Sequence, residues 1–189
     1  MATQDERRAA TLAAIIEAAT SLFGTRGFDA VSIDDVAHAA GVSKGGIYHH
    51  VDTKPALFRL VFERLQDALS DAVLAAAITA DSPRDQLQRG CAAFLEGCLE
   101  PRTAKIVLID GPRVLGWSTW RELDEARFLS LIRGTLDAID SKRNNDMRAH
   151  LLLGALDEAA LVIASAPDSA VALNAATREL DALITAMVD

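Results

Sequence analysis

Polar groups suited to contact another macromolecule lie close together between Ser43 and Lys54. The candidate contacts are Ser43, Lys44, Gly45, Gly46, Tyr48, His49, His50 and Lys54, with Ser32 upstream of them. A lysine at the start of a helix can reach a phosphate or a guanine edge. His49, His50 and Asp52 form a poor chelate, because neighbouring helical residues point about 100° apart. The stretch therefore favours nucleic-acid contact, and we assign no metal ligand.

Two short helices joined by a tight turn would position these groups. Ser32 can cap the first helix, with Asp35 at the capping-box spacing. The apolar residues of one helical face are Ile33, Val36, Ala37 and Ala40. Gly41 stands where the helix must end in a left-handed residue, Ser43 can cap the next helix, and Ile47 returns to the core. These features predict a helix-turn-helix, whose second helix, Ser43 to His50, enters the DNA major groove.

The spaced residues of this region resemble those of the tetracycline-repressor (TetR) family of bacterial transcription regulators. The residues that carry the resemblance are Leu22-Phe23, Gly27-Phe28, Val31-Ser32, Asp35-Val36-Ala37, Ala40 to Gly45, Ile47 to His50, Thr53-Lys54 and Leu57-Phe58. They cover the first third of the chain. The resemblance implies an N-terminal DNA-binding domain, placed at residues 1–52, and a helical ligand-binding and dimerisation domain at residues 53–189.

The resemblance also implies roles for individual residues. Tyr48 and His49 occupy positions that usually touch the DNA backbone or bases, and Lys54 matches a lysine that binds phosphate. His50 contacts phosphate or packs toward the core. Two departures stand out: Gly46 follows Gly45 where a larger residue is common, and Val51 replaces an aromatic residue. Two glycines in a short helix cost roughly 1 kcal/mol each, and we expect Gly46 to permit close approach to DNA.

The charge of the chain is unusual for a protein that binds DNA. Its net charge is −8, with 7 Lys/Arg and 8 Asp/Glu in residues 1–64 and with 12 and 19 in residues 65–189. Backbone amides at helix N-termini are therefore expected to supply much of the phosphate contact, with modest salt dependence. Charged residues interrupt the apolar stretches, and the first twenty residues lack the layout of a secretion signal. We expect a cytoplasmic protein without a membrane span.

The rest of the chain predicts an all-α fold with about nine helices. The expected helices after the turn span residues 53–80, 83–100, 103–110, 118–139, 145–164 and 168–187, and residues 4–23 precede it. We expect Gly24 and Gly27 to end the first helix, Gly111-Pro112 to interrupt the chain and Ser118 to cap the helix that follows. The family resemblance places the last two helices in a homodimer interface, although they could also complete a monomeric core. Cys91 and Cys98 are about 10.5 Å apart on one helix, too far for a disulfide. We expect two small buried residues rather than a redox sensor.

By resemblance, an effector pocket should lie among the middle helices of the second domain. The candidate lining residues are Phe94, Cys98, Asp110, Arg113, Trp117, Trp120, Phe128 and His150. Each bulky residue could equally belong to the core. The apolar and aromatic candidates favour a hydrophobic or aromatic small molecule over a sugar or nucleotide, and no cofactor motif appears.

The sequence as a whole favours a homodimeric repressor that binds a palindromic double-stranded operator and is released by a small molecule. A helical dimeric enzyme is one alternative, but no nucleophile with a nearby base and no evident pair of carboxylates appears. Asp157 and Glu158 are instead expected to be a polar or interface feature. A DNA-binding dimer without an effector is the other alternative.

Overall fold

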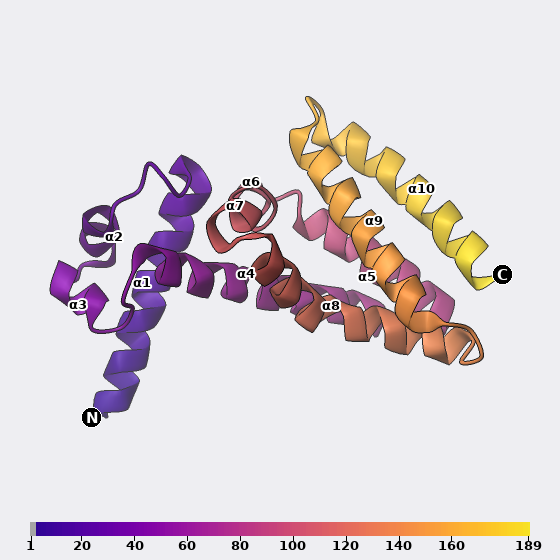
Figure 1. Cartoon of the computed structure of the whole chain (residues 1–189), viewed down its shortest axis with the longest axis horizontal. Helices are drawn as coiled ribbons and strands as arrows, with labels where there is room; N and C mark the ends of the chain where they lie inside the picture. The colour runs from indigo at the N-terminus through magenta and orange to yellow at the C-terminus, as the bar shows by residue number, and fades with distance from the viewer. Residues whose placement is uncertain (1–2) are drawn as a thin grey trace.

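The computed structural model describes residues 3–189, and every regular element in that range is helical (Figure 1). The elements are α1 Gln4–Arg26, α2 Ile33–Ala40, α3 Lys44–Tyr48, α4 Lys54–Ala77, α5 Pro83–Gly97, α6 Pro101–Thr103, η1 Ala104–Asp110, α7 Gly111–Leu115, α8 Trp117–Ile139, α9 Asn145–Ser165 and α10 Ser169–Val188. With α6, η1 and α7 counted as one continuous segment, the described residues form nine helical segments. The predicted all-α fold is confirmed.

Helices α1 to α3 and the start of α4 enclose an aromatic core. Phe23, Phe28 and Phe58 lie with ring centroids 5.3 to 5.7 Å apart. The sequence predicted that Gly24 would help to end α1, and this was wrong, because Gly24 lies inside the helix and is buried. Gly27, with φ of 81°, follows the last residue of α1. A glycine is required there because side chains rarely adopt this backbone conformation.

Helix α4 runs without a break from the helix-turn-helix region into the C-terminal bundle, as predicted (Figure 1). Its first turn is capped by Thr53, whose Oγ1 accepts a hydrogen bond from the Ala56 N–H at 3.1 Å. Pro55 fits the first turn because an N–H there has no helical partner. One rigid element therefore joins the two parts of the molecule.

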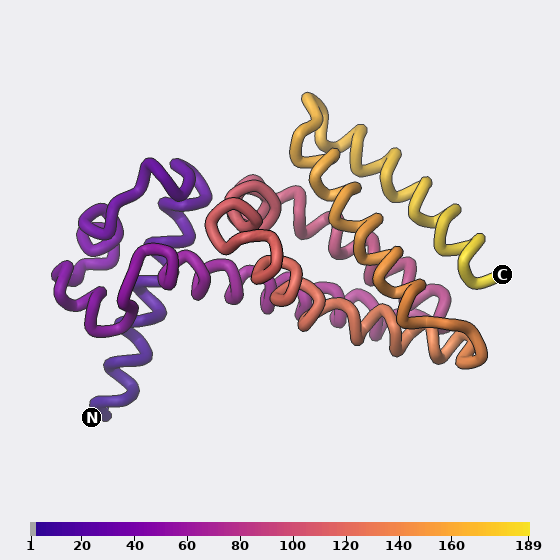
Figure 2. Tube along the Cα trace, in the orientation of Figure 1, coloured from indigo at the N-terminus to yellow at the C-terminus, as the bar shows by residue number. Residues whose placement is uncertain are grey.

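The C-terminal bundle packs α4, α5, α8, α9 and α10 around a shared apolar core (Figure 2). Between α5 and α8, the bent segment α6–η1–α7 lies against α1 and α4. The sequence predicted an interruption at Gly111-Pro112, but the chain remains helical there. Pro112 has no N–H to donate, and the Trp120 indole Nε1–H donates instead to the Val107 carbonyl, at 2.9 Å. Ser118 does not cap α8, which already begins at Trp117.

Candidate functional site

The turn between α2 and α3 is built by hydrogen bonds between residues that are near in sequence. Ser32 Oγ accepts from the Asp35 N–H at 3.0 Å, and Asp35 Oδ2 accepts from the Ser32 N–H at 2.8 Å. Hydrogen bonding from Ser32 lowers the pKa of Asp35 to about 2. Gly41 ends α2 with φ of 67° and ψ of 28°, in the left-handed region. The predicted capping box and glycine terminator are confirmed.

Helix α3 presents nearly all of its surface to solvent. Only Ile47 is fully buried, whereas Tyr48 is 46 % exposed. The exposed predicted contacts are Ser32, Ser43, Lys44, Gly45, Tyr48 and His49, and those of intermediate exposure are Gly46, His50 and Lys54. Packing on the rest of the chain therefore leaves this face open to another macromolecule.

The second helix of the motif is shorter than predicted. It ends at Tyr48, and His49 and His50 form a hydrogen-bonded turn in which the His50 N–H donates to the Ile47 carbonyl at 2.8 Å. The two glycines in a five-residue helix account for its early end, because glycine has a low helix propensity. Burial, together with nearby Arg8 and His49, lowers the pKa of His50 below its usual 6.5. His50 is therefore mainly neutral at pH 7.

The two candidate lysines are held by partners within the chain. Lys44 Nζ lies 2.8 Å from Asp34 Oδ2 on α2, and this hydrogen bond raises the pKa of Lys44. Lys54 Nζ lies 4.2 Å from the centre of the Phe28 ring, in a cation–π contact. Lys44 would have to exchange Asp34 for a phosphate or base. Loss of this ion pair would therefore offset part of the free energy that Lys44 gains by contacting DNA.

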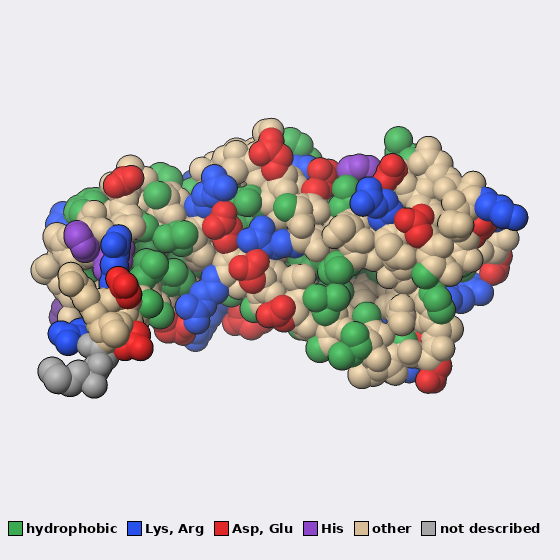
Figure 3. All heavy atoms as spheres, turned by 90° about the horizontal axis from the view of Figure 1, so that it is seen from below, with side chains coloured by type: hydrophobic (Ala, Val, Ile, Leu, Met, Phe, Trp, Pro, Cys, Tyr) green, Lys and Arg blue, Asp and Glu red, His purple; other side chains and the backbone are tan. Residues whose placement is uncertain are grey.

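The surface around this motif carries both signs of charge. Figure 3 shows Lys or Arg, Asp or Glu and His side chains interspersed at the end of the molecule that holds α1 to α3. Arg26 pairs with Asp35 at 3.5 Å, and Lys44 with Asp34. Acids thus already pair with Arg26 and Lys44, which supports the expectation of modest salt dependence.

A buried carboxylate ties the turn after α1 to the C-terminal bundle. Asp110 is 4 % exposed, and its Oδ2 accepts from the Phe28 N–H at 3.0 Å. Its Oδ1 accepts from Arg113 Nη2 at 3.0 Å, and Arg113 Nη1 lies 2.8 Å from Asp29 Oδ2. The sequence placed Asp110 and Arg113 in an effector pocket. They lie instead at this junction, where the Asp110 carboxylate accepts hydrogen bonds from the Phe28 N–H and from Arg113.

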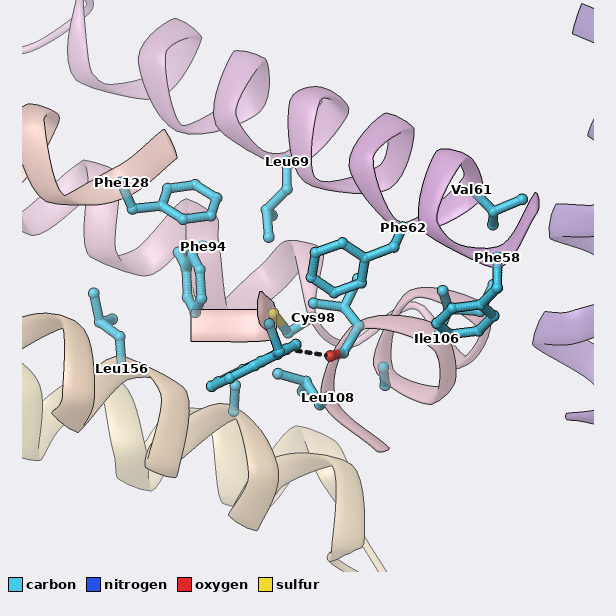
Figure 4. Packing of buried hydrophobic residues seen from close by; sticks show 14 of the residues in the cluster. Phe58, Val61, Phe62, Leu69, Phe94, Cys98, Ile106, Leu108, Phe128 and Leu156 are labelled. Atoms are coloured by element: carbon cyan, nitrogen blue, oxygen red, sulfur yellow. Dashed lines mark hydrogen bonds between the residues drawn. The ribbon is translucent and has the colours of Figure 1, made fainter. Parts of the chain in front are cut away.

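An apolar cavity of about 190 Å³ lies between α4, α5, α8 and α9. Most of its lining is apolar, and Gln86 and Thr135 add polar groups. Of the predicted pocket residues, Phe94 and Phe128 line it, with ring centroids 5.1 Å apart in an edge-to-face pair (Figure 4). Cys91 also lines it and was not predicted to do so. One turn separates it from Phe94 on α5, a spacing that could have indicated the shared face.

The other predicted pocket residues lie away from this cavity. Cys98 and Trp120 are buried in the core, and burial raises the pKa of both Cys91 and Cys98 to about 12. Both thiols are free and buried, as expected. Trp117 is 67 % exposed, because it starts α8 beside the Gly116 turn. His150 is half-exposed and faces Glu125, with Nδ1 3.4 Å from Oε1.

The structure contains a buried acidic cluster between α4, α8 and α9 that the sequence did not predict. Arg121 Nη1 lies 2.6 Å from Asp157 Oδ2 and 3.7 Å from Asp124 Oδ2, and Gln66 Nε2 donates to Asp124 Oδ1 at 3.3 Å. Burial raises the pKa of Asp124 to about 6. Burial and the nearby Asp124 carboxylate raise that of Asp157 to about 8. Asp157 was expected to be a polar or interface residue, and it is buried within the subunit because α9 packs on α8.

Known proteins share both parts of this architecture. Residues 15–61 match the family model described as "Bacterial regulatory proteins, tetR family", and residues 84–187 match "Tetracyclin repressor-like, C-terminal domain". The first match contains the helix-turn-helix, and the second contains the cavity and the acidic cluster except for their residues on α4.

Individual relatives agree with these matches. The chain is 26 % identical over 149 residues to the transposon Tn10 TetC protein of Escherichia coli, covering 78 % of this chain and 73 % of that protein. It is 36 % identical over 93 residues to the transcriptional activator FasR of Mycolicibacterium smegmatis, covering 49 % of this chain and 41 % of FasR.

The fold also matches a solved structure along nearly its whole length. A TetR-family transcriptional regulator from Pectobacterium atrosepticum aligns with a TM-score of 0.82 and 27 % identity, covering 96 % of this chain and 95 % of that one. No helix among residues 3–189 combines the length and hydropathy needed to cross a membrane. Given a helix-turn-helix with an open α3 face and a family match over both parts, this chain belongs to the TetR family of DNA-binding transcriptional regulators.

Proposed function

We propose that this regulator is a homodimeric repressor that binds a palindromic operator in the cytoplasm and is released by a small, largely apolar or aromatic molecule. Residues 1–52 would bind DNA, and residues 53–189 would bind the effector and form the dimer. The observation that carries the proposal is the exposure of α3, which keeps only Ile47 fully buried.

The DNA contacts would come from both side chains and backbone. Tyr48 and His49 extend from the exposed end of α3, and Lys44 stands at its start. The N-terminus of α4 and Lys54 would bind one phosphate together, since the first N–H groups of a helix attract anions. Ser32, Ser43, Gly45, Gly46 and His50 complete the proposed contact surface.

The dimer would form through α9 and α10. These helices expose large apolar side chains to solvent, namely Met147, Leu151, Val162, Val171 and Leu183. A second copy related by a twofold axis would cover them and would set two α3 helices on successive half-sites. We expect Leu151→Glu to yield monomers in sedimentation and to lose operator binding. Ile109→Glu, a control at an exposed apolar residue of η1, should remain dimeric.

The effector would occupy the cavity between α4, α5, α8 and α9 and shift α4. Because α4 also begins at the DNA-binding end, a tilt would change the spacing of the two α3 helices, and both half-sites could no longer be met. Selection of bound duplexes from random DNA, followed by binding assays with apolar and aromatic compounds, tests the proposal. It fails if no palindromic duplex is preferred.

The direction of regulation requires its own test, because FasR is an activator. A reporter gene placed behind the selected operator should be silenced by this protein and released by the effector. An effector-independent DNA-binding dimer would silence the reporter but would bind no compound in the cavity. Operator affinity that no tested compound changes would favour that alternative.

A further inference from the structure

Three buried oxygen atoms of the acidic cluster receive no hydrogen bond from residues 3–189. They are Gln66 Oε1, Asp124 Oδ2 and Asp157 Oδ1, and their residues are 0 %, 1 % and 7 % exposed. Buried acceptors are normally satisfied, since loss of water without a replacement donor is costly. The Gln66 amide is directed at this cluster, because its Nε2 donates to Asp124 Oδ1. The cluster therefore has an excess of acceptors over donors.

With Asp124 and Asp157 both ionised, the same cluster has an excess of negative charge. The Arg121 guanidinium is its central cation and serves Asp124, Asp157 and also Glu125, whose Oε1 lies 2.9 Å from Arg121 Nε. Arg127 on α8 also acts on Asp124, but its Nε bonds to Asp67 on α4 at 2.7 Å. His150 on α9 faces Glu125, and the Cys98 thiol, just after the end of α5, is neutral because burial raises its pKa. A further cation, rather than a neutral donor, would balance these carboxylates.

Two helices carry residues of the cluster and of the cavity lining close together. Asp124 precedes Phe128, which lines the cavity, by about one turn of α8. Asp157 follows Leu156, which lines the cavity. Phe128, which forms an edge-to-face pair with Phe94, therefore lies about 6 Å from Asp124 along the axis of α8.

We propose that Gln66, Asp124 and Asp157 form an amine subsite, which binds the protonated amine of an effector whose apolar body fills the cavity. The inference rests on the proposed role of the cavity as the effector site and names the chemical class of the effector. The Phe94 and Phe128 rings would turn aside to admit the amine. A metal ion fits less well, because residues 3–189 contain no group of three His, Cys, Asp or Glu side chains placed to hold one.

Gln66 links this subsite to the DNA-binding end. It belongs to α4, twelve residues after Lys54, or about 18 Å along one continuous helix. An ammonium group that bonds to Gln66 Oε1 and Asp124 Oδ2 would draw α4 toward α8. The amine would thus shift α4, which extends to the DNA-binding end, while the apolar body of the effector would supply most of the binding free energy.

Proton release provides an independent signature of the subsite. In the free protein Asp157 holds a proton up to about pH 8, because burial and Asp124 raise its pKa. An ammonium favours the carboxylate, so binding expels that proton. Affinity for an amine should therefore rise as the pH is increased from 6 to 8. Affinity for the corresponding alcohol should stay constant.

The experiment compares octylamine with octanol, and phenethylamine with phenethyl alcohol, by calorimetry on the full chain. We expect each amine to bind roughly tenfold more tightly than its alcohol at pH 8, as a charge-assisted hydrogen bond predicts. Asp157→Asn and Asp124→Asn should abolish this preference without weakening alcohol binding. Glu158→Gln, on the exposed side of α9, should retain it.

Two outcomes overturn the inference, and one of them leaves the proposed function intact. If amine and alcohol bind equally and both release operator DNA, the cavity is an apolar effector site without an amine subsite. If neither compound binds while operator binding is normal, both the inference and the effector role of the cavity fail. The amine-to-alcohol ratio within each variant corrects for any general change in packing.

Discussion

The polar groups around α3 and those between α4, α8 and α9 are built in opposite ways. Lys44 and Asp34 are ten residues apart and exposed, and Ser32 and Asp35 are three apart. Asp157 and Arg121 are 36 residues apart, and Asp124 and Gln66 are 58 apart. The first set is satisfied by near neighbours in the chain. The second set depends on helix packing, and it retains acceptors without donors.

This difference indicates what each region is suited for. A surface that local hydrogen bonds hold in shape can meet a large partner without rearranging the core. A buried cluster with unmet acceptors is sensitive to small molecules and to protons, because each change of charge is felt at low dielectric. The junction at Asp110 connects the two regions, because Asp110 and Phe28 are 82 positions apart in the sequence.

The largest effect is expected at the junction. Asp110→Ala leaves the Phe28 N–H and Arg113 Nη2 without their acceptor, so the free energy of unfolding should fall by about 2–3 kcal/mol. Asp29→Ala removes only the exposed end of the Arg113 pair and should cost less than about 1 kcal/mol. Urea denaturation followed by circular dichroism measures both. Equal losses would show that the buried carboxylate contributes no more than an ordinary surface ion pair.

A close approach between α1 and α6 gives the next effect. A Cβ added at Gly24 would lie 2.5 Å from Arg102 Cβ and 3.1 Å from its Cα, so the helices must separate. Gly24→Ala should destabilise by about 1–3 kcal/mol through overpacking. Gly134→Ala in α8, with nothing within 4 Å, should instead stabilise by up to about 1 kcal/mol. Thermal unfolding measures the stability of both variants. Higher stability of Gly24→Ala would contradict the close contact between α1 and α6.

The buried acids should make stability depend on pH. The pKa of Asp157 is about 8 in the folded protein, and its ordinary value is 3.8. The folded state therefore binds more protons between pH 4 and pH 8, so stability falls as pH rises through this window. Asp157→Asn removes this dependence. The free energy of unfolding of the variant, measured relative to wild type, should therefore be higher at pH 8 than at pH 5 by about 1–2 kcal/mol.

Denaturation of Asp157→Asn and wild type across this range checks the sign. The control Glu158→Gln is exposed and should follow the wild-type slope. A parallel slope for Asp157→Asn and wild type would mean that Asp157 is ionised throughout, and that Arg121 alone balances it.

The smallest effect is expected in α3 itself. Gly46→Ala should raise stability by up to about 1 kcal/mol, because alanine favours the helix and its Cβ meets Ser43 Oγ at no less than 3.4 Å. Operator affinity should nevertheless fall, since the added methyl group would occupy the space of close DNA approach. Thermal unfolding and a duplex-binding assay measure the two effects. Equal or tighter binding by the variant would refute the role assigned to Gly46.

The sequence by itself determined the local structure of this protein. The caps at Ser32, Ser43 and Thr53 and the left-handed Gly41 follow from short-range rules, because both partners lie within a few residues. The same holds for the apolar periodicity that gives the helices. Periodicity also indicated the continuity of α4, since no breaker interrupts its stripe.

Only the tertiary structure decided how distant polar residues combine. Asp110 looked like a pocket residue but serves the junction, and Trp120 supplies the donor that Pro112 lacks. Asp124 and Asp157 lie on different helices, and their proximity depends on the rotation of α8 against α9. Helical periodicity tells which face is buried, but not which residue of another helix it meets. Which residues meet depends on how the side chains of two helices fit together, and on the high cost of burying an unpaired charge.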